Sequence, residues 1–152
     1  KATVTASSAT KEGPAHFATD GINRLINDGQ SHQCQAPMSG PPPYIELAWD
    51  RKVHISNIML VFDTGLHRFL RISPQDVVYH DQIRGPQPET ICDYEISAYT
   101  ADKWTTIVQA EGNYQRRVEH IVQPVLTNRL RLTINKTNGD PLARLFEIRC
   151  YT

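Results

Sequence analysis

Short segments in which apolar and polar residues alternate dominate this sequence of 152 residues. No apolar pattern between them is long enough for a helix of three turns. The alternating segments are residues 44–49, 54–62, 94–99, 104–109, 117–122, 129–134 and 145–151. Strands that follow one another without helices pair in antiparallel fashion, and this number in one chain is typical of a sandwich or barrel. The sequence therefore predicts an all-β fold, an antiparallel β-sandwich of the jelly-roll kind, formed by a single domain over residues 1–152.

Charge and hydropathy exclude several classes of partner. The chain has 16 Lys plus Arg and 16 Asp plus Glu, so its formal net charge is zero. A nucleic-acid-binding domain normally carries a basic excess, and we expect no nucleic-acid partner. The longest apolar runs, such as Ile58 to Phe62, are far too short to span a membrane. Because Lys1 stands where an initiator Met would be and no signal-type apolar region follows, we expect a piece of a larger protein.

The three cysteines are too sparse for a disulfide scaffold. Cys34, Cys92 and Cys150 form no C-x-x-C pair, and an odd number cannot pair fully within one chain. Their favoured role is that of small buried hydrophobic residues. One disulfide in an exported protein is the alternative.

The lengths of the connections are unequal at the two ends of the predicted sandwich. Successive antiparallel strands alternate in direction, so alternate connections share an end. The short connections at one end are residues 50–53, 100–103 and 123–127, and the long ones at the other are residues 27–43, 63–90, 111–116 and 135–143. Long polar loops on a rigid scaffold are where binding residues concentrate. We therefore expect a binding surface at the end with the long loops.

Three segments, in order along the chain, resemble the discoidin or coagulation-factor type C domain, a galactose-binding-like β-sandwich. The segment Phe17 to Asn23 is similar to its early Ala-x-Asp-Gly-x-Asn motif. Tyr44 to Trp49, followed by Ile55 to Ile58, resembles its core hairpin, and Leu145 to Ile148 resembles its closing Glu-Ile strand. The sequence departs from this pattern at residues 33–34, where Gln and Cys stand in the region of the usual Trp, and in the greater length of the loop over 63–90.

A closer resemblance covers the second half of the chain. Residues 83–88, 111–116 and 137–148 are similar to the discoidin-like C-terminal domain of some bacterial FAD-dependent oxidoreductases. This chain lacks a G-x-G-x-x-G segment between a strand and a helix, so we expect no FAD in this domain. It also lacks the usual nucleophile, zinc and phosphate-loop motifs, and we expect no catalytic residues.

Six residues are our candidates for ligand binding at the long-loop end. An exposed aromatic ring can stack on the apolar face of a sugar ring, while arginine and asparagine side chains bind the hydroxyl groups. The candidates are His67, Arg68, Arg84, Asn113, Tyr114 and Asn138. The alternative for Arg84 and Asn113 is that they hydrogen-bond the loop backbones and keep the long connections ordered.

The resemblance also implies a structural calcium ion that ties the early loop to the final strand. Asp20 and Glu147 occupy the matching motif positions, and Asn23 could supply a further oxygen ligand. In the alternative interpretation, Asp20 caps its own Asp-Gly turn, and Glu147 pairs with Arg24 or Arg149.

Together these observations favour a non-catalytic carbohydrate-binding accessory module of a larger bacterial enzyme, secreted or otherwise outside the cytoplasm. Its partners would be a carbohydrate and a catalytic domain of the same polypeptide. The alternative function is a structural or assembly domain that packs against a flavin-dependent oxidoreductase core and has no ligand of its own.

Overall fold

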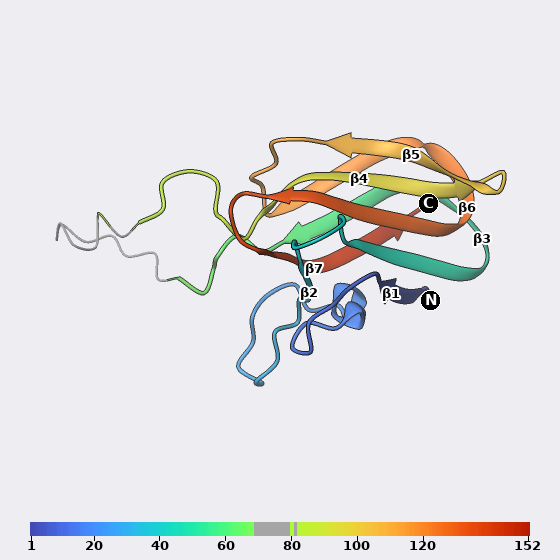
Figure 1. Cartoon of the computed structure of the whole chain (residues 1–152). Coiled ribbons are helices and arrows are strands. Elements are labelled where there is room, and N and C mark those ends of the chain that lie inside the picture. The colour runs from blue at the N-terminus through green and yellow to red at the C-terminus, as the bar shows by residue number, and fades with distance from the viewer. Residues whose placement is uncertain (69–79, 81) are drawn as a thin grey trace.

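Antiparallel strands make up most of the computed structural model, which describes residues 1–68, 80 and 82–152 (Figure 1). The strands are β1 (Thr3–Ala6), β2 (Cys34–Pro37), β3 (Tyr44–Phe62), β4 (Ile91–Thr100), β5 (Lys103–Ala110), β6 (Arg117–Thr137) and β7 (Leu142–Tyr151). One 3-10 helix, η1, spans Ala15–Thr19. No helix in the described ranges is long and apolar enough to cross a membrane. The predicted all-β antiparallel architecture is confirmed.

The two longest strands, β3 and β6, pair with each other along nearly their whole length. The first half of β3 pairs with the second half of β6, as in Ile45 with Leu132, and the remaining halves pair as in Leu60 with Val118. Figure 1 shows both strands folding back at the end of the molecule opposite the loop that follows β3. We predicted two separate strands in each case. The structure joins them into one strand in each case. The pairing shifts register after Ala48 and resumes at Val53 with Thr127.

Each half of this paired ribbon carries one layer of the sandwich. The first half of β3 also pairs with β1, and the second half of β6 pairs with β4, which pairs with β5. The second half of β3 pairs with β7, and β7 pairs with β2. The core lies between these layers and includes Ile58, Leu60, Phe62, Ile96, Leu130 and Leu132, each with no exposed surface. Full burial of one such side chain stabilises the fold by about 1.5–3 kcal/mol.

The sequence reading missed β1, β2 and η1. Strand β2 lies inside the stretch 27–43 that we predicted to be a loop, and it pairs with β7 through Cys34 with Leu145 and Ala36 with Ala143. β1 and β2 each have four residues. Two alternations are too few to distinguish a strand from a loop by periodicity, and pairing with a longer strand decides the structure.

All three thiols are free, and the expected role as small buried residues is confirmed for Cys34 and Cys92. Cys150 is partly buried and packs against the core. Burial raises the pKa of both Cys34 and Cys150 to about 12. These thiols therefore remain protonated at neutral pH and lack the thiolate that nucleophilic chemistry needs.

One polar pair reaches into this core. The Tyr94 hydroxyl lies 2.8 Å from His120 Nε2, and its ring packs against Phe62 with a centroid separation of 5.3 Å. Burial raises the pKa of Tyr94 to about 12 and lowers the pKa of His120. The Tyr94 hydroxyl and the His120 imidazole therefore share this hydrogen bond as two uncharged groups.

We expect His120 to make the fold less stable in acid. Its pKa is about 6.5 in the unfolded chain and lower in the folded chain, so the unfolded state binds more protons below that value. The neutral His120 ring contributes fully to the free energy of unfolding above about pH 6.5. This contribution is lost as the pH falls through the pKa of His120 in the folded state. The measurement is the melting temperature of the protein and of His120→Gln at about pH 7.5 and about pH 5. The variant should lose less stability on acidification, and an identical loss in both proteins would contradict this role.

Candidate functional site

The long loops gather at one end of the sandwich, as the alternation of strand direction predicted. The backbone amide of Asp140 donates to the Pro88 carbonyl at 3.1 Å, and the amide of Met38 donates to the Pro141 carbonyl at 2.9 Å. The loop over 111–116 joins them through Asn113 and Asn138. Residues 69–79 and 81 of the 63–90 loop lie outside the described residues. We call the surface formed by described residues of these loops the loop end.

Asn113 and Asn138 are brought together by a direct contact, and both side chains hold loop backbone. Asn138 Nδ2 donates to the Asn113 carbonyl at 3.0 Å and to the Thr90 carbonyl at 3.2 Å. Asn113 Nδ2 donates to the Ile91 carbonyl at 2.8 Å, and its Oδ1 accepts from the Gln115 amide at 3.1 Å. This is the alternative role that the sequence left open for Asn113. The two amides keep three loops in a fixed arrangement.

Arg68 and His67 converge on one buried carboxylate, Glu89. The Arg68 guanidinium forms two bonds with Glu89, one of them 2.8 Å long, and a third with Gln87 Oε1 at 2.7 Å. His67 Nε2 lies 3.8 Å from Glu89 Oε1, while half of the His67 side chain is exposed. The bond from Arg68 lowers the pKa of Glu89 and raises that of Arg68. Both groups are therefore charged, and the pair fixes the two ends of the 63–90 loop to each other.

Tyr114 is the most exposed aromatic residue of the loop end. Of its surface, 63% is open to solvent, although it follows Asn113, which is anchored by hydrogen bonds. Arg84 is also exposed, in the stretch 83–86. A mobile ring loses entropy when it stacks on a ligand, and an anchored backbone lowers that cost. Tyr114 is thus the candidate residue best suited to form an apolar contact with a ligand.

Gln33, in the region where the resembling family has tryptophan, forms a buried polar link instead. Its Nε2 donates to Asp63 Oδ2 at 2.9 Å, and the two residues are 3% and 4% exposed. Asp63 Oδ1 accepts the Gly65 amide at 2.8 Å. A buried carboxylate needs such donors. This link anchors the residue before β2 to the start of the 63–90 loop, and sequence reasoning did not predict it.

Asp20, the first predicted calcium ligand, is engaged by a histidine. His32 Nδ1 lies 2.7 Å from Asp20 Oδ2, and His32 Nε2 lies 2.8 Å from Asp28 Oδ2. A neutral imidazole has only one N–H, so two carboxylate partners require the protonated ring. Hydrogen bonds to Asp20 and Asp28 accordingly raise the pKa of His32. Asp20 Oδ1 also accepts the Ile22 amide at 2.8 Å, which is the turn cap considered as the alternative.

Glu147 and Asn23, the other predicted metal ligands, have partners of their own. Glu147 is 2% exposed, and its Oε1 accepts from Arg149 Nε at 2.6 Å, one of the two pairings considered as alternatives. Its Oε2 is buried without a hydrogen-bond partner. The Asn23 carbonyl accepts from Arg116. Across residues 1–68, 80 and 82–152, no group of three or more His, Cys, Asp or Glu side chains is arranged to hold a metal ion.

Comparison with known proteins identifies the fold. No protein-family model matches the sequence, and no curated protein is detectably similar to it. Solved structures are similar over the whole chain. A family 32 carbohydrate-binding module of Clostridium perfringens NanJ, in complex with galactose, has a TM-score of 0.71 and 17% identity, covering 99% of this chain and 93% of that one.

Two further structures agree. A fucose-binding module of Streptococcus pneumoniae has a TM-score of 0.72 at 12% identity, with coverage of 100% and 94%. A chitosan-binding module from a Paenibacillus chitosanase/glucanase has a TM-score of 0.71 at 15% identity, with coverage of 99% and 95%. The protein has the discoidin-like, galactose-binding-like β-sandwich fold that family 32 carbohydrate-binding modules share. The predicted fold type is confirmed.

We expect Arg68→Ala to destabilise the protein by about 1–3 kcal/mol, because it leaves the buried Glu89 carboxylate without its main donor. Chemical denaturation measures this free energy of unfolding. The matched control is Arg117→Ala, which removes an exposed pair with Glu119 and should cost less than about 1 kcal/mol. Equal effects of the two substitutions would show that Arg68 does not anchor the loop.

Proposed function

We propose that this protein is a non-catalytic carbohydrate-binding module whose ligand site is the loop end. The observation that carries the proposal is the combination of fold and loop placement. The sandwich matches galactose-, fucose- and chitosan-binding modules over nearly their full length. In this chain the same fold gathers its long loops at one end and holds them with backbone hydrogen bonds.

The chemistry of the loop end supports a sugar ligand. Tyr114 offers an exposed ring to the C–H face of a pyranose, and Arg84 and His67 offer donors to its hydroxyl groups. Arg68, Asn113 and Asn138 hold the framework through their contacts with Glu89 and the loop backbone. In this division of roles, three of the six candidates contact the ligand, and the other three hold the loops that carry those contacts.

A binding module of this kind has no reaction to catalyse, and its use is to hold an enzyme near its substrate. We propose that the partner is a catalytic domain in the same polypeptide, and that the two work on glycans outside the cytoplasm. Linking a binding domain to a catalytic one raises the effective concentration of substrate without any new contact.

Replacing Tyr114 by Ala should weaken retention on the glycan that the protein binds and leave the melting temperature unchanged. Truncating an important binding residue costs more than about 1 kcal/mol, or at least roughly fivefold in affinity. The ligand is first identified on a glycan array, and affinity electrophoresis then compares the variants. The control is Tyr151→Ala, a partly exposed tyrosine at the end of β7.

Two results would contradict the proposal. Equal retention of both variants would remove Tyr114 from the site. Repeated absence of binding to every glycan on the array would favour the alternative, a domain that packs against an oxidoreductase core.

We further propose a structural calcium ion at Asp20, Asn23 and Glu147. The buried Glu147 Oε2 supports this proposal, because an unpaired carboxylate oxygen is costly unless a cation neutralises it. The His32 contact opposes it, since a cation at Asp20 must compete with the imidazolium. When bound, the ion would supply a link between the early loop and β7. It would take no part in chemistry.

Removing calcium should lower the melting temperature and adding it back should restore the original value, because a ligand of the native state stabilises by mass action. The control is Glu147→Gln, which keeps the shape of the side chain but should no longer respond to calcium. If elemental analysis shows that the protein is metal-free and calcium still does not change its melting temperature, the early loop is held by His32 instead.

A further inference from the structure

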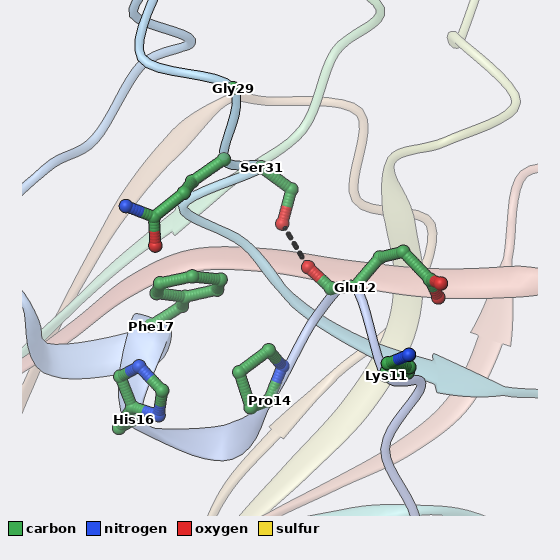
Figure 2. Close-up of a pocket in the computed structure, with 8 residues that line it drawn as sticks. Lys11, Glu12, Pro14, His16, Phe17, Gly29 and Ser31 are labelled. Carbon is green, nitrogen blue, oxygen red and sulfur yellow. Dashed lines mark hydrogen bonds between the residues drawn. The ribbon is translucent and has the colours of Figure 1, made fainter.

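A groove unrelated to the six predicted residues lies beside η1. It is lined by residues of the segments 11–17 and 29–31, and its volume is about 480 Å³. Figure 2 shows the Phe17, His16 and Pro14 rings on one side and the backbone of Glu12 opposite, joined to Ser31. Small-molecule sites typically enclose about 300–1,000 Å³, so the groove can accept one sugar unit.

Its two walls are held rigidly against the sandwich. Ser31 Oγ donates to the Glu12 carbonyl at 2.7 Å, and the Gln35 amide donates to the Gly13 carbonyl at 2.9 Å. A Cβ atom at Gly13 would lie 2.5 Å from the Gln35 side chain, so only glycine permits this close approach to β2. A groove whose backbone is already fixed loses little entropy when it binds a ligand.

The lining combines an apolar base with a polar rim. Phe17 is 7% exposed and forms the base with Pro14. Lys11, His16 and Gln30 are exposed at the rim. A pyranose has the complementary arrangement, with C–H groups on its faces and hydroxyl groups around its edge.

The charges of the groove favour a neutral sugar over an anion. Lys11 brings one positive charge, and the neighbouring Glu12 brings one negative charge. Figure 2 shows the Glu12 carboxylate turned away from the Phe17 and Pro14 rings, so it does not block the base. A phosphate or sulfate would require several donors without a nearby carboxylate.

We propose that this groove is a second sugar-binding site, which takes one neutral hexopyranose unit against Pro14 and Phe17 with Lys11 and Gln30 on its hydroxyl groups. The groove includes residues 29–31 of the 27–43 loop, but it contains none of the six candidate residues of the loop end. One glycan, or two chains of a polysaccharide, could then be held at two points, which raises avidity by effective concentration.

The experiment is a titration of the 15N-labelled full chain with galactose and, separately, with N-acetylgalactosamine, followed by amide chemical shifts. For at least one sugar, we expect saturable shifts at residues 11–17 and 29–31. Shifts at residues 111–116 would report binding at Tyr114 separately. Gln30→Ala and Lys11→Ala should each weaken this binding about threefold to tenfold, the loss of one hydrogen bond. Lys103→Ala, at the first residue of β5, is the matched control and should change nothing.

Tyr114→Ala separates this proposal from the previous one. It should abolish shifts at the loop end and leave those of the groove intact. If neither sugar shifts the amides of residues 11–17 and 29–31, or if Gln30→Ala and Lys11→Ala bind as tightly as the original protein, the groove is not a sugar site, whatever the loop end binds.

Discussion

The pairing of β3 with β6 is the interaction on which the rest of this structure depends. Both strands bend midway, and their ladder continues from one layer of the sandwich into the other. Every other strand attaches directly or through one neighbour to a half of this ribbon. Because both strands fold back at the same end, the long connections after β3, β5 and β6 must emerge together at the opposite end (Figure 1). The candidate binding surface is therefore a consequence of the ribbon.

Polar contacts hold the loops of the loop end to one another. The side chains of Asn113 and Asn138 hydrogen-bond backbone carbonyl groups, and Arg68 bonds the Glu89 carboxylate. A loop with few apolar contacts opens easily unless such bonds hold it. The framework leaves Tyr114 exposed on an ordered segment, so little entropy would be lost if this ring stacked on a ligand.

Charged groups in this protein are paired wherever burial would make them costly. On the outer face of one layer, Glu46 accepts bonds from Arg129 and Arg131, and Arg131 lies over the Tyr44 ring at 3.9 Å and the Trp104 ring at 4.2 Å. These contacts tie β3, β6 and β5 together across the sheet. Two charged groups of the described residues keep one buried atom without a hydrogen-bond partner: Arg131 at Nε and Glu147 at Oε2. Of these two atoms only the carboxylate oxygen could bind a cation.

The sequence by itself determined the all-β class, the positions of the longer strands and the end at which the long loops gather. These follow from the alternation of apolar residues and from connection lengths, which are local properties. It also indicated the fold family through segments such as Phe17 to Asn23 and Leu145 to Ile148. Only the tertiary structure decided that β3 and β6 pair on both sides of their bends, that β2 is a strand, and that His32 contacts Asp20. Those outcomes depend on partners distant in sequence, such as Leu145 for Cys34, which periodicity within a segment cannot reveal. The sequence also placed Asn113 at the end with the long loops. It could not show that both polar atoms of the Asn113 side chain bond to backbone, because those partners are set by the tertiary structure.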